Sequence, residues 1–173
     1  MTNKTNIALI GMPGAGKSTV GKLLASQLGM SFCDTDQLIE STQQSVLQDI
    51  LDVQGFERLR AIEEQTILDH TFNNTVIATG GSAIYGAKGI AYLQSCAVLF
   101  YLEASIGTLT KRINNWGDRG IACPESQSFD DLFAERVPLY QQYAVHTVAT
   151  DNSDETQDET QIAERIIHLW ERG

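Results

Sequence analysis

The sequence predicts one α/β domain with three layers, in which a parallel sheet of about five strands lies between two layers of helices. Short apolar segments of strand length alternate with longer segments whose apolar residues recur at helical spacing. Strands that alternate with helices are joined by right-handed crossovers, which leave the strands parallel and both faces of the sheet covered. The chain has 173 residues, of which 42% are hydrophobic, so one domain spanning residues 1–173 can bury a core of its own.

The first part of the chain begins with a strand and a helix. Residues 6–10 are an apolar run, and residues 17–28 carry apolar side chains at the spacing of one helix face. Residues 31–34 are the second expected strand. A polar, helix-prone stretch follows from residue 36 to about residue 70, interrupted by Gly55.

The alternation continues through the rest of the chain. Residues 75–79, 97–102 and 145–149 are the third, fourth and fifth expected strands, and residues 159–171 form a last helix with one apolar face. Residues 114–128 contain two glycines and a proline and show no apolar period. Because connections of this length in compact domains are usually functional or disordered, we expect a mobile loop there.

The charge of the chain limits its partners. Twelve basic and 22 acidic residues give a formal net charge of −10. We therefore expect no nucleic-acid partner, because binding to the phosphates of nucleic acids depends on Lys and Arg. If the chain binds a small anion, its few basic residues must be concentrated at one site. The three cysteines have neither metal-binding spacing nor an even count, which disfavours a zinc site and a disulfide framework. The apolar run at residues 7–10 is too short for a signal peptide or a membrane span, so we expect a cytoplasmic protein without a membrane partner.

The strongest motif is GMPGAGKS at residues 11–18, which matches G-x-x-x-x-G-K-[ST] and lies between an expected strand and an expected helix. Its glycines bring backbone N–H groups close to phosphate oxygens, and the helix dipole favours their negative charge. The lysine can bridge the outer phosphates, and the serine hydroxyl can bind Mg²⁺. We therefore expect the chain to bind a nucleoside triphosphate. The expected nucleotide contacts in this loop are Gly11, Gly14, Ala15, Gly16, Lys17, Ser18 and Thr19.

Two more strand ends carry residues suited to the same site, because ligands of parallel sheets bind beyond the carboxyl ends of the strands. Asp34 and Asp36 follow the second strand, and alternation along a strand would point both side chains the same way. One could hold Mg²⁺, and the other could orient an acceptor hydroxyl or accept its proton. A turn and helix N-cap is the alternative explanation. Gly80 and Gly81 follow the third strand and allow close approach of a small ligand, although a tight turn alone would also explain them.

Three arginines outside the phosphate-binding loop are candidates for anion binding. Arg60 is followed one helical turn later by Glu63, which could steer its guanidinium. Arg119 lies in the expected mobile loop, and Arg136 lies in the helix that follows. The planar guanidinium can donate two parallel hydrogen bonds to a carboxylate or phosphate, although a solvated surface position is the alternative for any one arginine.

Taken together, these motifs resemble those of shikimate kinases. Six elements occur in the order and spacing of that family: the phosphate-binding loop, Asp-x-Asp, Gly-x-x-x-Leu-Arg-x-x-Glu, Thr-Gly-Gly, an arginine in the mobile loop, and Arg-x-Pro-Leu-Tyr. The likeness covers nearly the whole chain, from residue 7 to the last helix. It implies the three-layer P-loop fold of nucleoside monophosphate kinases in a monomer, with a mobile lid at about residues 114–128 and an acceptor-binding region at about residues 36–72.

The resemblance also implies roles on the nucleotide side. Lys17 and Ser18 would hold the phosphates of ATP and Mg²⁺, with Asp34 supporting the metal. Arg112 lies near the place where the family stacks an arginine on adenine. Arg119 would move in with the lid and stabilise the charge of the phosphoryl group in transfer.

On the acceptor side, the resemblance implies that Arg60 and Arg136 clamp the carboxylate of shikimate, a small hydroxylated carboxylic acid. Asp36 would contact the hydroxyls of the acid and serve as a base or an orienting group. Gly80 and Gly81 would pack against the acid. The implied catalytic residues are Lys17, Asp36 and Arg119.

The chain departs from the family pattern at places that border the expected acceptor pocket. Ser82 stands where the family has a third glycine, and the lid reads Arg-Gly-Ile-Ala at residues 119–122 where the family has Arg-Pro-Leu-Leu. Phe56 follows Gly55 in place of a glutamate, and Leu59 precedes the arginine in place of an aromatic residue. These departures bear on the acceptor rather than on the nucleotide.

The predicted function is that of a shikimate kinase, which transfers the γ-phosphoryl group of ATP to the 3-hydroxyl of shikimate in aromatic amino acid (chorismate) biosynthesis. The first alternative is a kinase of the same fold for another small hydroxylated acid, such as gluconate or homoserine. The second is a nucleoside monophosphate kinase, and the third is a nucleotide-binding protein without catalytic activity.

Overall fold

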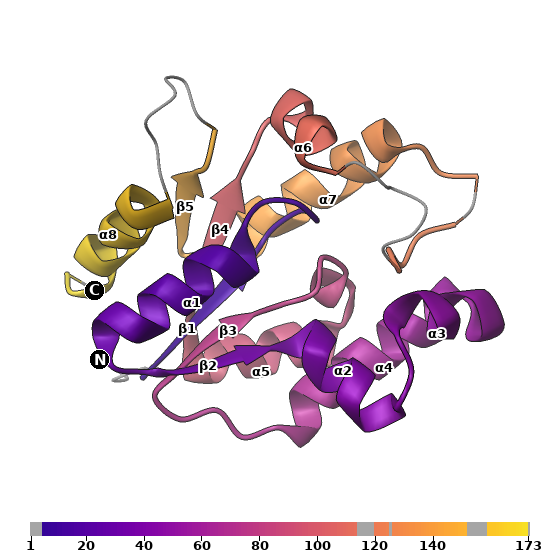
Figure 1. The fold of residues 1–173 in the computed structure, drawn as a ribbon, viewed down its shortest axis with the longest axis horizontal. Coiled ribbons are helices and arrows are strands. Elements are labelled where there is room, and N and C mark those ends of the chain that lie inside the picture. The colour runs from indigo at the N-terminus through magenta and orange to yellow at the C-terminus, as the bar shows by residue number, and fades with distance from the viewer. Residues whose placement is uncertain (1–4, 114–119, 125, 152–158, 173) are drawn as a thin grey trace.

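A computed structural model describes residues 5–113, 120–124, 126–151 and 159–172 of the chain (Figure 1). Five parallel strands form one sheet in the order β2-β3-β1-β4-β5. The strands are β1 (Asn6–Ile10), β2 (Ser31–Asp34), β3 (Thr75–Ala78), β4 (Ala97–Glu103) and β5 (His146–Ala149). The first two have the predicted bounds, and each of the others differs from its predicted bounds by one residue at one end.

Helices connect these strands throughout the described part of the chain. They are α1 (Lys17–Leu28), α2 (Thr35–Gln43), α3 (Leu47–Gln54), α4 (Phe56–Asp69), the 3-10 helix η1 (Ala83–Tyr85), α5 (Ala87–Cys96), α6 (Ile106–Arg112), α7 (Phe129–Tyr143) and α8 (Glu159–Trp170). Among the described residues, no helix combines the length and the apolar character that crossing a bilayer would require.

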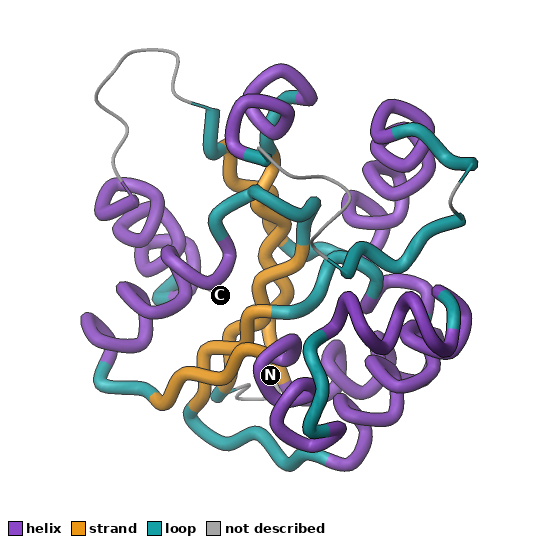
Figure 2. The backbone as a smooth tube through the Cα atoms, turned by 45° about the vertical axis from the view of Figure 1, so that its right-hand side comes forward, coloured by secondary structure: helices purple, strands orange, loops and turns teal. Residues whose placement is uncertain are grey.

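The helices cover both faces of the sheet. On one face α1 packs against β3 and α8, and on the other face α5 and α7 pack against β4. The tube view shows the strands lying between helices on either side (Figure 2). The predicted three-layer α/β/α arrangement is confirmed.

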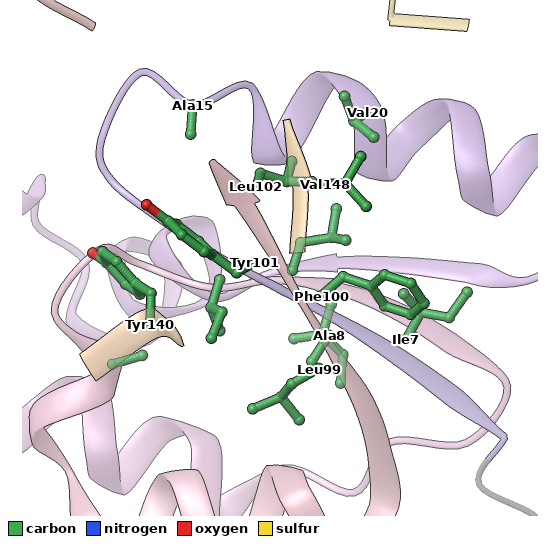
Figure 3. Packing of buried hydrophobic residues seen from close by; sticks show 14 of the residues in the cluster. Ile7, Ala8, Ala15, Val20, Leu99, Phe100, Tyr101, Leu102, Tyr140 and Val148 are labelled. Atoms are coloured by element: carbon green, nitrogen blue, oxygen red, sulfur yellow. The ribbon is translucent and has the colours of Figure 1, made fainter. Parts of the chain in front are cut away.

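The core is centred on β1, which is buried along its whole length in the middle of the sheet. Figure 3 shows its residues Ile7 and Ala8 packed beside Leu99 and Phe100 of β4. A parallel strand that is covered on both faces has apolar side chains on both sides, which explains the continuous apolar run in the sequence.

One polar side chain closes the amino-terminal edge of this core. Asn6 Nδ2 donates to the carbonyl oxygens of Phe72, at 3.1 Å, and of Cys96, at 3.0 Å, and Thr75 N donates to Asn6 Oδ1 at 2.9 Å. The Asn6 side chain thereby satisfies buried backbone groups at the start of β3 and the end of α5, and it ties both to β1.

The polar stretch after β2 folds as three separate helices. α2 ends before Gln44, which has a left-handed φ of 52°, and α3 and α4 are separated by Gly55, which has a φ of 81°. The three helices pack around a small second core beside the main one. Its buried members are Ile39, Ile50, Leu59, Ile62 and Ala122.

The register of the sheet decides where the functional residues lie. Asp34, at the end of β2, is paired with Ala78 of β3, and Ala78 is paired with Leu9 of β1. The three strands therefore end at one edge of the sheet. The loops that follow them carry the motifs found in the sequence.

Candidate active site

The phosphate-binding loop leads from β1 directly into α1. Gly16 precedes α1 with a φ of 91° and has no side chain to cap the helix. Gly14 has a φ of 83°, and a Cβ at this position would lie 2.9 Å from Ile113 Cγ1, so the loop requires glycine there. The loop thus presents backbone N–H donors at the positive end of a helix, which is an arrangement that binds phosphate.

Lys17 is held inside this loop by main-chain oxygens. Its Nζ donates to the carbonyl oxygens of Gly11, at 2.8 Å, and Met12, at 2.9 Å. Burial lowers the pKa of the Lys17 ammonium to about 8, while the negative charge of Asp36 opposes that change. The ammonium is therefore still mostly charged at neutral pH, and phosphate oxygens can replace the two carbonyl oxygens as its partners.

Ser18 and Asp34 form the pair of oxygen ligands expected for Mg²⁺. Ser18 Oγ donates to Asp34 Oδ2 at 2.6 Å, and the other carboxylate oxygen accepts from Asp36 N at 3.1 Å. Mg²⁺ commonly binds one or two protein oxygens and completes its shell with substrate phosphates and waters. The pair fits that chemistry, and the residues the structure describes include no cluster of three or more His, Cys, Asp or Glu that could hold a metal by itself.

The helix N-cap explanation of the Asp-x-Asp motif is confirmed, and the arrangement of the two side chains differs from the prediction. Asp34 caps α2, which begins at Thr35, so Asp36 lies in the first turn of a helix. The prediction that strand alternation aligns the two side chains is wrong, because β2 ends at Asp34. The helix turn brings Asp36 to the cavity instead, while Asp34 stays beside Ser18.

Asp36 meets a second carboxylate at Gly80. A Cβ at Gly80 would overlap Glu63 Oε1 and would lie 2.5 Å from Asp36 Oδ1, so no side chain fits between the two acids. Gly80 N donates to Thr35 Oγ1 at 2.9 Å, which fixes the turn after β3 against α2. Ser82, the residue that replaces the third glycine of the motif, donates its hydroxyl to Glu63 Oε2.

Both carboxyl groups have raised pKa values, and burial is the main cause in each case. Burial, with the negative charge of Asp34 added to it, raises the pKa of Asp36 to about 6. Burial and the charge of Asp36 raise the pKa of Glu63 to about 7, although the Ser82 hydroxyl and the cations Arg136 and Lys17 favour its charged form. Glu63 Oε1 is buried without a hydrogen-bond partner among the described residues. The expected role of Glu63 in steering Arg60 is not what the structure shows.

Arg60 and Arg136 converge on one oxygen atom. Arg60 donates to the carbonyl oxygen of Ala122 from Nε, at 3.1 Å, and from Nη2, at 3.0 Å, and Arg136 Nη2 donates to the same oxygen at 3.0 Å. Arg136 is 1% exposed, so its charge is held in the interior. Two guanidinium groups that donate to one point could also bind a carboxylate there, and in this structure a carbonyl oxygen occupies that point.

One cavity of about 780 Å³ extends from the phosphate-binding loop to Ala122 and Arg136. The predicted site residues that line it are Gly14, Ala15, Gly16, Lys17, Ser18, Thr19, Asp36, Gly80, Gly81, Arg112 and Arg136. The cavity is not lined by three of the predicted residues, Gly11, Asp34 and Arg60. Arg60 is adjacent to it, because its guanidinium donates to the carbonyl oxygen of Ala122, which does line the cavity. The structure therefore brings most of the predicted site residues to one place.

Gly81 lies where the two halves of the cavity meet. A Cβ at this position would lie 2.9 Å from Arg136 Nη1 and 3.0 Å from Pro13 Cδ, so the turn after β3 passes closely between the arginine and the phosphate-binding loop. Tyr140 donates its hydroxyl to the Gly81 carbonyl at 2.6 Å and stacks on Tyr101 of β4 (Figure 3). These contacts fix the acceptor side of the cavity to the sheet.

The predicted lid is described only in part. Arg119 lies outside the described residues. Gly120 N donates to Gln48 Oε1 at 2.7 Å, and Ile121 and Ala122 are buried. Arg112, at the end of α6, donates from Nη2 to the Thr150 carbonyl at 3.0 Å and lines the nucleotide side of the cavity.

Sequence reasoning missed two parts of this site. The first is the position of the Glu63 carboxylate beside Asp36. Glu63 is part of the Leu-Arg-x-x-Glu pattern, but the pattern suggests Arg60 as its partner. The second is the carbonyl oxygen of Ala122. A main-chain atom leaves no signal in the residue types, so no motif could have indicated it.

Comparisons with known proteins point to one family. A sequence model described as shikimate kinase matches residues 13–169 of the chain. The shikimate kinase of Vibrio vulnificus (strain YJ016) is 35% identical to the chain over 176 residues, which cover 100% of both proteins. The shikimate kinase 2 of Yersinia enterocolitica is 32% identical over 94% of each protein. A solved structure of shikimate kinase from Acinetobacter baumannii in complex with shikimate has a TM-score of 0.85 and 31% identity, covering 95% of this chain and 91% of that one.

Replacing Glu63 by glutamine is expected to change the pH dependence of stability. Burial raises the carboxyl pKa from 4.5 to about 7, so the folded chain keeps a proton that the unfolded chain releases in that range. Wild-type stability therefore falls as pH rises through this window, whereas the glutamine variant carries no charge to bury. The quantity to compare is the free energy of unfolding of the variant minus that of the wild type. This difference should increase by up to roughly 3 kcal/mol between pH 4.5 and pH 8.

Urea unfolding followed by circular dichroism across this pH range measures the difference. The variant Glu57→Gln, at an exposed position on the same helix, is the matched control and should show no such trend. A difference between Glu63→Gln and wild type that stays constant with pH would contradict the burial of a charge at this position.

Proposed function

This chain belongs to the shikimate kinase family, and from that membership we propose that its cavity transfers the γ-phosphoryl group of ATP to the 3-hydroxyl of shikimate. The product is shikimate 3-phosphate, an intermediate of aromatic amino acid (chorismate) biosynthesis. The observation that carries the proposal is the convergence of Arg60 and Arg136 on one oxygen position, beside the cavity that also holds Lys17 and Asp36. That cavity can hold a carboxylic acid and the phosphates of ATP at the same time.

On the donor side, the phosphates of ATP bind the backbone N–H groups of the phosphate-binding loop and the first turn of α1. Lys17 exchanges its two carbonyl partners for phosphate oxygens. Ser18 and Asp34 are the residues that would hold Mg²⁺, which neutralises phosphate charge when it is bound. Arg112 lies at the same end of the cavity, where its planar guanidinium can stack on the adenine ring.

On the acceptor side, Arg60 and Arg136 bind the carboxylate, and this orients the hydroxyls of the ring toward Asp36 and the phosphates. The 3-hydroxyl oxygen forms a bond to the γ-phosphorus while the bond from that phosphorus to the bridging oxygen of ADP breaks. The hydroxyl proton passes to the Asp36 carboxylate, which orients the hydroxyl before transfer. Gly80 and Gly81 have no side chains, so the turn after β3 passes close to Asp36, Glu63 and Arg136 and lines the cavity beside the ring of the acid.

Arg119 completes the proposed site from the lid at residues 114–128. Its guanidinium would neutralise the charge that spreads over the phosphoryl oxygens during transfer. Closure of the lid would exclude water, which competes with the acceptor for ATP. We further propose a cytoplasmic monomer. One chain supplies every residue that lines the described cavity. The three cysteines, all of which lie in the described residues, form no disulfide with one another, as is usual in a reducing compartment.

Release of ADP with a panel of acceptors tests the proposed function. We expect ADP release with shikimate, and mass spectrometry should find one phosphoryl group added to the acid. Gluconate, homoserine, nucleoside monophosphates and buffer alone should give no release above background. Release with one of these in place of shikimate would identify a different acceptor. If no acceptor supports release while ATP still binds, the chain is a nucleotide-binding protein without kinase activity.

Removing either arginine fork should weaken acceptor binding selectively. We expect Arg60→Ala and Arg136→Lys each to raise the KM for shikimate by about 10- to 100-fold, because each loses charge-assisted hydrogen bonds to the carboxylate. The lysine at the second position keeps the buried charge but cannot donate in a fork. Steady-state kinetics should show the KM for ATP within about twofold of wild type. The control is Arg58→Ala, at an exposed position two residues away on α4, and an equal rise in the KM for ATP would contradict the assignment.

Replacing Arg119 by alanine should lower turnover more than nucleotide affinity. An arginine that acts on the transition-state charge can contribute about 10³-fold or more to kcat, so we expect a large loss of kcat at saturating substrates. The Kd for ATP, measured by calorimetry, should change by less than about threefold. Equal losses in kcat and in nucleotide affinity would place this arginine in ground-state binding instead.

A further inference from the structure

Tyr85 lies against both arginines of the proposed carboxylate site but does not line the cavity. The Cζ atom of Arg60 is 3.7 Å from the centroid of the Tyr85 ring, and the Cζ atom of Arg136 is 5.4 Å from it. Both distances are within the range of cation–π attraction. Phe56, one turn before Arg60 on α4, lies 5.0 Å from the same guanidinium. The aromatic contacts of Arg60 are therefore made by side chains that do not line the cavity.

The ring of Tyr85 is itself fixed at its far end. Its hydroxyl donates to Glu135 Oε1, and Gln127 Nε2 donates to the other oxygen of that carboxylate at 2.7 Å. Burial and the bond to Glu135 raise the pKa of the Tyr85 hydroxyl, so the side chain stays a neutral phenol. Glu135 directly precedes Arg136 on α7, so the tyrosine joins the turn after β3 to the helix that carries the second arginine.

The arrangement has an electrostatic cost that the tyrosine offsets. Two guanidinium groups that donate to the same oxygen repel each other, and the carbonyl of Ala122 carries no charge to compensate them. The negative face of an aromatic ring attracts both cations, and the carboxylate beyond its hydroxyl adds a negative charge nearby. Arg60 is only half-buried, so without the ring its long side chain would gain rotamers that point into solvent.

We propose that Tyr85 is a positioning residue for the acceptor carboxylate: its ring holds Arg60, and more weakly Arg136, in the orientation that binds the acid. The proposal rests on the proposed function, because it takes the two arginines as the acid-binding groups. It adds a residue that acts through Arg60 without touching the acid. It also predicts that the ring, rather than the hydroxyl, carries most of the effect.

Substitutions at Tyr85 separate the ring from the hydroxyl. Tyr85→Leu and Tyr85→Met remove the aromatic face, and each is expected to raise the KM for shikimate by about 5- to 30-fold. The KM for ATP and the kcat at saturating shikimate should stay within about twofold of wild type, because the arginines bind the ground state and the transition state alike. Tyr85→Phe keeps the face and should stay within about threefold of wild type in every constant. Thermal unfolding of each variant checks that it is folded.

Two further variants provide the controls. Tyr92→Leu removes a tyrosine of similar burial on α5, whose hydroxyl donates to the His70 carbonyl, and it should leave the KM for shikimate unchanged. In a chain that already carries Arg60→Ala, adding Tyr85→Leu should raise the KM for shikimate by less than about a further twofold, because the ring has then lost its main partner. A full additional loss in that background would show that Tyr85 acts by another route.

The outcomes distinguish this inference from the proposed function. If the wild-type chain does not phosphorylate shikimate, the proposed function fails. If the wild-type chain does phosphorylate shikimate, but Tyr85→Leu and Tyr85→Met have the same KM for shikimate as the wild type, the inference fails and the proposed function stands. An equal loss in Tyr85→Phe would assign the effect to the hydroxyl and overturn the ring's role. An equal rise in the KM for ATP would indicate a general loss of structure and would also overturn it.

Discussion

The parallel pairing of β2, β3 and β1 is the constraint on which the rest of the structure depends. It places the ends of three strands side by side, and each strand continues into one part of the site. β1 leads into the phosphate-binding loop, β2 leads into Asp34 and Asp36, and β3 leads into Gly80 and Gly81. The side chain of Asn6 joins β1 to the start of β3 at the opposite edge, so the pairing of these two strands is fixed where they begin as well as where they end.

Within this frame, the site is a set of opposed charges held out of water. Lys17 and Arg136 are buried beside Asp36 and Glu63 in a chain whose net charge is −10. Burial alone would drive these groups toward their neutral forms, and the opposite charges counteract that tendency. Among the residues that the structure describes, Lys17, Arg60 and Arg136 have no carboxylate within salt-bridge distance. Lys17 and the two arginines are instead partnered by neutral carbonyl oxygens, which anionic ligands can replace.

Much of this could be predicted from the sequence, because strands, helix faces and glycine-rich turns are local patterns. The five strands and α1 were predicted from the residues, and most of the residues predicted for the site line one cavity. What could not be predicted depends on the exact residue at which a helix begins and on contacts between distant segments. The direction of Asp36 depends on α2 beginning one residue after the strand ends. The partner of Glu63 comes from the turn after β3, and the ring beside Arg60 comes from η1. Helical spacing on α4 suggests neither contact.

Because the carbonyl oxygen of Ala122 already accepts from both arginines, the free energy with which an acid would bind there is a difference. It equals the hydrogen bonds gained by the acid minus those lost by the carbonyl oxygen. A carboxylate that enters between the arginines gains their hydrogen bonds only as the chain's own oxygen gives them up. The carbonyl belongs to the backbone, so replacing the alanine side chain would not remove this built-in competitor. A negatively charged carboxylate and a neutral carbonyl oxygen would then compete for one position between the arginines. The carboxylate is favoured because its charge strengthens the hydrogen bonds from the two guanidinium groups.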